Sequence, residues 1–184
     1  MPYTSFHHYF QEIAKGETRT ITIMREDDIV PKGSYGLLEM YCDDPGCDCR
    51  RVFLEVHDWE REKDVAFIAY GWESKVFYRN WFRGDDPEII RDLQGPVLND
   101  ASPQSKYAPA FLKLVKDVVL SDQAYIERLK RHYWMFKEKV DPKHFAFSGA
   151  SVSRIDNPTY EIMEDKMTAP SSKKPRKRHR RRAN

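Results

Sequence analysis

Alternating polar and apolar positions predict strands in the first part of the chain. Between residues 18 and 24, threonines alternate with Ile21 and Ile23, the pattern of a strand with one buried face. Three further segments, each rich in β-branched and aromatic side chains, are predicted to be strands at 35–42, 50–57 and 64–70. Short polar segments separate the four strands. Sequential strands with short connections favour an antiparallel meander.

Apolar residues at helical spacing come before and after these strands. Residues 4–15 are predicted to form one amphipathic helix, because apolar side chains recur at i, i+3, i+4 and i+7 from Phe6. In the second half, helices are predicted to begin at Lys75, at Asp86–Pro87, near Pro109, and at Ser121 or Asp122. The predicted fold class is therefore α+β. It combines a four-stranded antiparallel meander with an N-terminal helix and a C-terminal helical half packed on the sheet.

The last predicted helix carries a histidine on its apolar face. Tyr125, Leu129, His132 and Phe136 follow one another at spacings of four, three and four. His132 is therefore expected to point toward the core. It is either a buried histidine that is hydrogen-bonded to a neighbour or a metal ligand supplied by the fold.

Three cysteines within eight residues are the strongest chemical signal. They form the pattern C-x4-C-x-C at Cys42, Cys47 and Cys49, between two predicted strands. Asp44-Pro45-Gly46-Cys47 fits a type II turn, because proline presets φ at the first central position and glycine accepts a positive φ at the second. We expect a β-hairpin whose tip brings the three sulfurs together.

Zinc is the expected occupant of such a site, because it takes four ligands and prefers thiolates and imidazoles. Three sulfurs leave one position to fill. His57 lies roughly 26 Å past Cys49 along an extended strand and is excluded as a ligand from the same hairpin. His132 is the preferred fourth ligand, and a carboxylate or water is the alternative. The carboxylates near the turn belong to Asp43, Asp44 and Asp48.

Two other interpretations of the cysteines stay open. Free cysteines often pack as small buried apolar side chains. A redox role is the second alternative, although intracellular thiols usually stay reduced and a disulfide would leave one thiol over.

The apolar pattern ends near Gly149. We predict one domain over residues 1–148 and a disordered tail over 149–184, because the end of the chain is rich in charge and nearly free of apolar residues. Residues 173–184 hold eight of the 31 Lys and Arg and none of the 29 Asp and Glu. The overall charge of +2 therefore combines an acidic domain with a strongly basic tail.

A dense basic run binds phosphate backbones with little sequence specificity. The residues expected to make such contacts are Lys173, Lys174, Arg176, Lys177, Arg178, Arg180, Arg181 and Arg182. The partner would be RNA, the ribosome or another polyanion. A purely solubilising tail is the alternative.

The segment Tyr41–Val52, with its Y-C-x-D-P-x-C-D-C-R-R-V pattern, resembles a family of uncharacterised bacterial proteins. Residues 104–108 (QSKYA) share this resemblance, which covers much of residues 33–140. Some members of that family end in a zinc motif of the SEC-C type. The tail of this chain contains no cysteine and therefore lacks that motif.

Several function classes lack their sequence signals. The chain has no apolar run long enough for a membrane span and no visible secretory signal, so cytoplasmic localisation is expected. It has no glycine-rich phosphate loop, no H-E-x-x-H and no G-x-S-x-G. The leading hypothesis is a small zinc-binding protein that acts through interactions. The alternatives are a metal- or thiol-dependent enzyme centred on the cysteines and a nucleic-acid-binding protein that acts through its tail.

Overall fold

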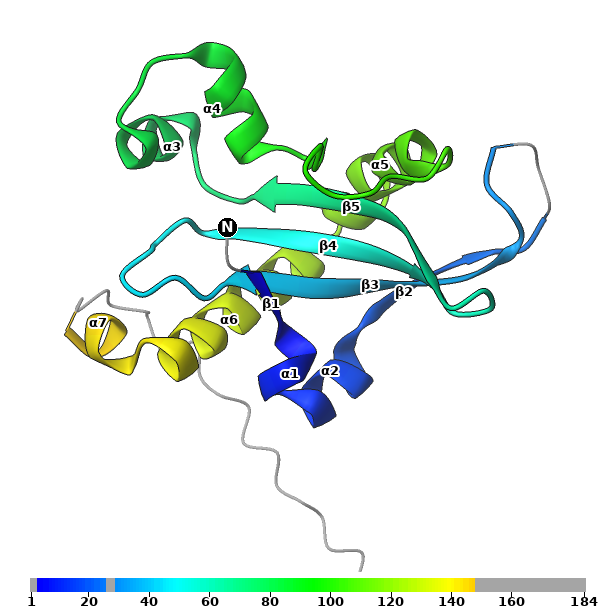
Figure 1. Cartoon of the computed structure of the whole chain (residues 1–184), viewed down its shortest axis with the longest axis horizontal. Helices are drawn as coiled ribbons and strands as arrows, with labels where there is room; N and C mark the ends of the chain where they lie inside the picture. Colours follow the sequence, from blue (N-terminus) through cyan, green and yellow to red (C-terminus); the bar gives the residue numbers. More distant parts are fainter. Residues whose placement is uncertain (1–2, 26–28, 148–184) are drawn as a thin grey trace, which may run out of the picture. The chain divides into compact units, whose positions relative to one another are not determined.

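An antiparallel sheet of six strands forms the centre of the computed structural model, which describes residues 3–25 and 29–147 (Figure 1). The strands are β1 (Tyr3–Ser5), β2 (Arg19–Ile23), β3 (Gly33–Cys42), β4 (Arg51–Asp58), β5 (Lys63–Gly71) and β6 (Val97–Leu98). Their order is β1-β3-β4-β5-β6, and β2 also pairs with β3. β1 and β2 lie end to end along the same edge of β3, because β1 pairs with residues 40–42 and β2 with residues 33–37.

The predicted meander is present as β2 to β5, but the prediction of four strands missed two. β1 falls at the start of the segment expected to be helical, where Tyr3 pairs with Cys42. β6 pairs its two residues with Ile68 and Ala69 of β5. Both strands have three residues or fewer, too short to show an alternating pattern.

Seven α-helices surround the sheet within the described residues. They are α1 (Phe6–Tyr9), α2 (Gln11–Glu17), α3 (Lys75–Phe82), α4 (Pro87–Gln94), α5 (Ala108–Asp117), α6 (Gln123–Val140) and α7 (Pro142–Phe147), with a 3-10 turn, η1 (Val119–Ser121), between α5 and α6. The helix predicted over residues 4–15 is divided in two at Phe10, whose φ of −129° and ψ of 51° are not helical. Asp86 and Asp122 cap α4 and α6 with their side chains, as their positions in the sequence predict.

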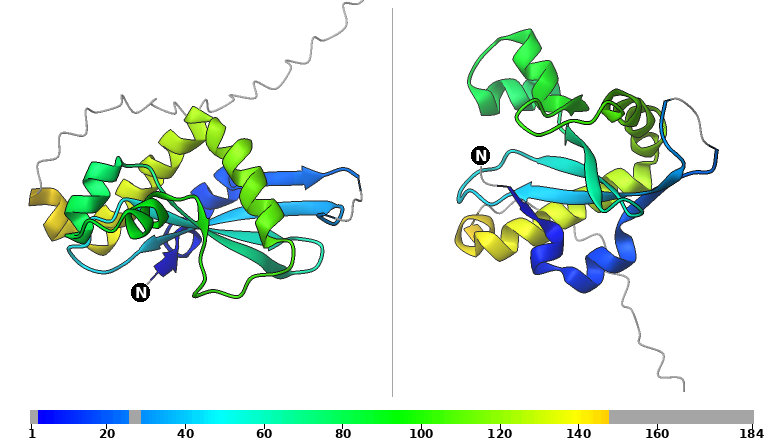
Figure 2. Two further views of the ribbon diagram at one scale, coloured as in Figure 1. Left: turned by 90° about the horizontal axis from the view of Figure 1, so that it is seen from above. Right: turned by 45° about the vertical axis from the view of Figure 1, so that its right-hand side comes forward.

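The main core lies between the sheet and two helices. α5 and α6 lie on one side of the sheet (Figure 2), where Leu37, Leu54 and Ile68 are fully buried. Tyr35 of β3 packs edge-on against Phe111 of α5, with ring centroids 4.7 Å apart. Because strand residues alternate between faces, the neighbouring positions point to the opposite side, where Leu38, Phe53 and Phe67 are only half-buried.

The described residues belong to one compact unit, and none of their helices is long and apolar enough to cross a membrane. The predicted domain end near residue 148 and the predicted tail lie outside the described residues and stay predictions.

Candidate metal centre

The connection between β3 and β4 brings the three cysteines together. Cys42 ends β3, and Cys47 and Cys49 follow in the connection. Their Sγ atoms all lie within 4.8 Å of one another, and all three thiols are free. Cys42 and Cys49 are buried, whereas Cys47 is half-buried. The prediction that the hairpin tip gathers three sulfurs is confirmed.

Local backbone geometry explains how the sulfurs converge. Gly46 has a φ of +74°, a conformation that glycine adopts without steric cost. The Cys47 N–H donates to the Asp44 carbonyl oxygen at 3.2 Å and closes the turn. Both features match the type II turn expected from the sequence.

Side chains of α6 and of the junction between α6 and α7 hydrogen-bond to this turn. Lys137 of α6 is fully buried, and its Nζ donates to the carbonyl oxygens of Cys42 at 3.0 Å and Asp44 at 3.2 Å. Asp141 lies between the two helices and accepts the Gly46 N–H at 2.6 Å. This hydrogen bond holds the pKa of Asp141 below its usual value. The turn is therefore fixed by contacts distant in sequence as well as by its own conformation.

Arg50 anchors the other end of the connection. Its backbone adopts a positive φ of 47°, which is unusual for a residue with a side chain. Its guanidinium pairs with Asp48 at 2.9 Å and with Glu73 at 3.0 Å. The Tyr78 hydroxyl donates to the Arg50 carbonyl oxygen at 2.9 Å, and the Arg50 N–H donates to the Tyr133 hydroxyl oxygen at 3.3 Å. These contacts stabilise a strained residue directly after Cys49.

The three thiols form one electrostatic unit. Hydrogen bonds from Cys47 and Cys49 lower the pKa of the Cys42 thiol, and nearby Lys137 also favours its thiolate. Hydrogen bonding to Cys42 raises the pKa of Cys49 and of Cys47, because each keeps its proton as the donor, and burial raises both pKa values further. One thiolate is therefore favoured without a metal, and a cation is needed to stabilise three.

The sulfur spacing fits a tetrahedral metal ion. With Zn–S bonds of about 2.3 Å, sulfurs in a tetrahedral site are about 3.8 Å apart. The sulfurs of this chain are at most 4.8 Å apart, about 1 Å more than that spacing. Rotation of the cysteine side chains can bring them closer by this amount.

The carboxylates near the turn are mostly engaged elsewhere. Asp48 binds Arg50 and accepts from the Tyr133 hydroxyl at 3.1 Å. Asp43 accepts from Thr4 Oγ1 at 2.6 Å, and its other oxygen is buried without a partner among the described residues. Asp44 is exposed. None of the three joins the group of sulfurs within the described chain.

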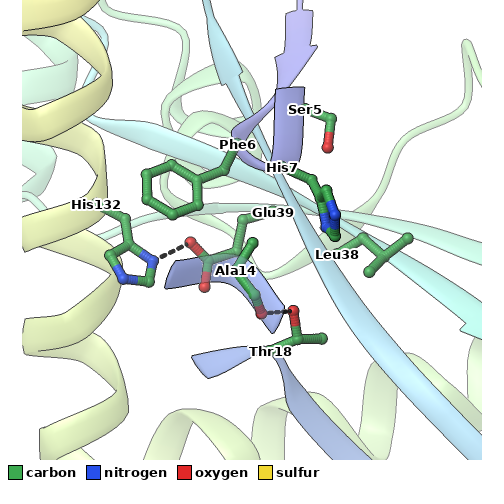
Figure 3. Close-up of a pocket in the computed structure, with 8 residues that line it drawn as sticks. All are labelled: Ser5, Phe6, His7, Ala14, Thr18, Leu38, Glu39 and His132. Atoms are coloured by element: carbon green, nitrogen blue, oxygen red, sulfur yellow. Dashed lines mark hydrogen bonds and ion pairs between the residues drawn. The ribbon is translucent and has the colours of Figure 1, made fainter. Parts of the chain in front are cut away.

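His132 is buried on α6, as expected, but it does not lie with the sulfurs. Its Nδ1 is 2.7 Å from Glu39 Oε2, and its Nε2 is 3.1 Å from Glu17 Oε2. Figure 3 shows the ring directed at Glu39 and stacked on Phe6, with centroids 4.2 Å apart. Both ring nitrogens therefore face carboxylates. This arrangement corresponds to the hydrogen-bonded alternative, and we do not retain His132 as a metal ligand.

A different histidine lies beside the turn. Nδ1 of His144, on α7, is 4.0 Å from the position that a Cβ on Gly46 would occupy. In the described structure its ring nitrogens also lie outside the group of sulfurs, so its side chain would have to move to reach a metal there. His57, excluded on strand length, instead pairs with Asp64 at 2.7 Å. No sequence pattern points to His144, because its approach depends on the junction between α6 and α7. The basic residues 173–182 lie outside the described part of the chain.

Comparisons with protein-family models, with curated proteins and with solved structures find no match to this chain. The resemblance of Tyr41–Val52 to a bacterial family therefore stays a prediction.

Proposed function

We propose that this chain is a zinc-binding protein in which the metal fixes the β3–β4 turn against α6 and α7. The observation that carries this proposal is the grouping of three free cysteine sulfurs within 4.8 Å. The turn that presents them is held by Lys137 and Asp141. Because the turn is preformed, metal binding would cost less conformational entropy than binding to a flexible loop that must first be ordered.

Charge balance favours a neutral fourth ligand. Zn²⁺ with three thiolates carries a net charge of −1, which the buried ammonium group of Lys137 neutralises. A carboxylate in the fourth position would leave an uncompensated negative charge. We propose His144 as the fourth ligand, since its Nδ1 lies 4.0 Å from the position of a Cβ on Gly46, the residue before the half-buried Cys47.

A structural role for the metal is better supported than a catalytic one. Two of the three sulfurs are buried, and none of the cysteines lines either of the two pockets described in the structure. Catalytic zinc sites keep an open position that substrate can reach. We therefore propose a protein that acts through interactions, in a reducing compartment such as the cytoplasm that keeps the thiols available.

The basic tail is the proposed contact for a polyanion. Its eight Lys and Arg within residues 173–182 supply a dense positive charge, while the rest of the chain is acidic. RNA or the ribosome is the partner class that such a charge distribution favours.

Metal analysis of the purified full chain tests the zinc proposal. We expect about one equivalent of zinc, with thermal destabilisation on adding a chelator. Cys47→Ser and His144→Ala should weaken zinc binding, whereas the matched control His8→Ala, an exposed histidine of α1, should not. Less than about a tenth of an equivalent, together with no effect of chelator, would refute the proposal.

A further inference from the structure

The sheet face opposite the main core carries a large groove, and Leu112 of α5 also contributes to its lining. Its volume is about 920 Å³, within the range of small-molecule sites. The floor comes from Met40, Phe53 and Ala69, which lie side by side in register across β3, β4 and β5. None of the three cysteines lines the groove, so its occupant would not touch the sulfurs.

The walls of the groove are mainly apolar. Ile89 and Leu93 of α4 form one wall, and Leu98 of β6 contributes to another. Ile89 remains 39% exposed although it is a large apolar residue, and Phe53 and Phe67 are only half-buried. Apolar surface that gathers in a concave site rather than in the core is typical of ligand-binding grooves.

A buried cation lines this groove. Arg51 is only 8% exposed, and its Nη2 donates to the Asp92 carbonyl oxygen at 3.0 Å. Its Nε is buried and has no hydrogen-bond partner among the described residues. No carboxylate of the described chain forms an ion pair with Arg51. The Asp92 side chain pairs instead with Arg91, and Asp100, the other acid of the lining, is exposed.

A buried guanidinium without a carboxylate is costly, and it presents donors in a planar fork. A carboxylate matches that fork with two parallel hydrogen bonds and supplies one compensating negative charge. The nearest aromatic contact, the Phe53 ring at 5.7 Å from Arg51 Cζ, does not neutralise the charge.

We propose that the groove binds a small molecule with an apolar body and one carboxylate. The carboxylate pairs with Arg51, and the apolar body lies over Phe53 and Ala69 against Ile89 and Leu93. A single cation at the site favours a singly charged acid over a phosphate ester, which carries more charge and more acceptor oxygens. None of the three cysteines lines this site, although Tyr3, which does, pairs with Cys42 across β1 and β3.

Titration of the full chain with octanoate and with 1-octanol, followed by NMR, tests the proposal. The two probes share an apolar chain and differ in the carboxylate. We expect saturable binding of octanoate that is at least tenfold tighter than that of octanol. Arg51→Gln should weaken octanoate binding at least tenfold and leave octanol binding unchanged, which also shows that the variant is folded. Ile89→Glu, at an exposed wall position, should weaken both probes.

Arg91→Gln is the matched control, because Arg91 lies on α4 but does not line the groove. It should bind both probes as the unmodified chain does. Octanoate binding that Arg51→Gln leaves unchanged, equal affinity for the two probes, or no saturable octanoate binding at millimolar concentration would each overturn the proposal.

Discussion

Two buried cations without carboxylate partners define the chemistry of this protein at the residue scale. Lys137 is fully buried and donates only to carbonyl oxygens, while Arg51 is 8% exposed and lacks an ion-pair partner among the described residues. Buried charges are normally paired. We propose that each cation is compensated by a specific negative charge. For Lys137 it is the charge of the metal-bound thiolates, and for Arg51 it is the carboxylate of a ligand.

Replacing Lys137 by methionine tests the first of these pairings. Lys137→Met keeps the volume but removes the positive charge and both hydrogen bonds to the turn. We expect zinc affinity to fall by about 10–100-fold, as for other groups that support metal ligands. Competition with a chromophoric chelator measures this affinity. Lys139→Met, at an exposed position of the same helix, is the control, and equal affinities of the two variants would contradict the charge-balance argument.

Glu55 gives the protein a defined pH dependence. Burial, together with a hydrogen bond to Asp64 and its negative charge, raises the pKa of Glu55 from 4.5 to about 7, although His57 partly opposes this. Between these two values the folded protein holds a proton that the unfolded chain has released. Stability is therefore lost as pH rises from 4.5 through 7.

Glu55→Gln should remove this loss. We expect the variant to melt at a higher temperature than the unmodified chain at pH 8, with the difference shrinking toward pH 4.5. Thermal unfolding at both pH values measures it, and Glu60→Gln, at an exposed position, is the control. A difference that grows toward low pH would show that the sign is wrong.

At the scale of elements, the cysteine turn depends on the junction between α6 and α7. Asp141 accepts the Gly46 N–H with one carboxylate oxygen and the His144 N–H with the other. A single side chain thus connects the turn to the first residues of α7. This link places His144 beside the turn without any nearby sequence signal.

Asp141→Ala should release the turn. The amides of Gly46 and Cys47 are expected to exchange with deuterium at least about tenfold faster, because the link to α7 is lost while the hairpin remains. Hydrogen exchange of the metal-free protein measures this effect. Asp117→Ala, at the exposed end of α5, should leave the exchange rates of both amides unchanged. Slow exchange in both variants would show that the turn is stable without the contact to Asp141.

The sequence predicted the elements with a clear period and missed those without one. β2 to β5 and α3 to α6 have enough residues to show alternation, helical spacing or caps. β1 and β6 are too short for a pattern, and Phe10 divides a continuous apolar stripe into two helices. The sulfur cluster was predictable because its turn is local. The roles of Lys137, His144 and Arg51 depend on tertiary neighbours and were not.

On the scale of the whole molecule, the basic tail is expected to act separately from the folded domain. Deleting residues 170–184 should abolish binding to single-stranded RNA at low salt and remove its salt dependence. A version with the tail residues in scrambled order keeps the charge and should bind as before. Filter binding across a salt series measures both. Binding that survives the deletion would place the contact on the folded domain instead.

The central claim concerns what surrounds the metal, and zinc K-edge X-ray absorption of the zinc-loaded full chain addresses it directly. We predict three sulfur neighbours at about 2.3 Å and one nitrogen at about 2.0–2.1 Å. In His144→Ala, the outer-shell scattering from an imidazole ring should be lost while the three sulfurs remain. A shell made mostly of nitrogen and oxygen, or two sulfurs or fewer, would contradict the proposed zinc site.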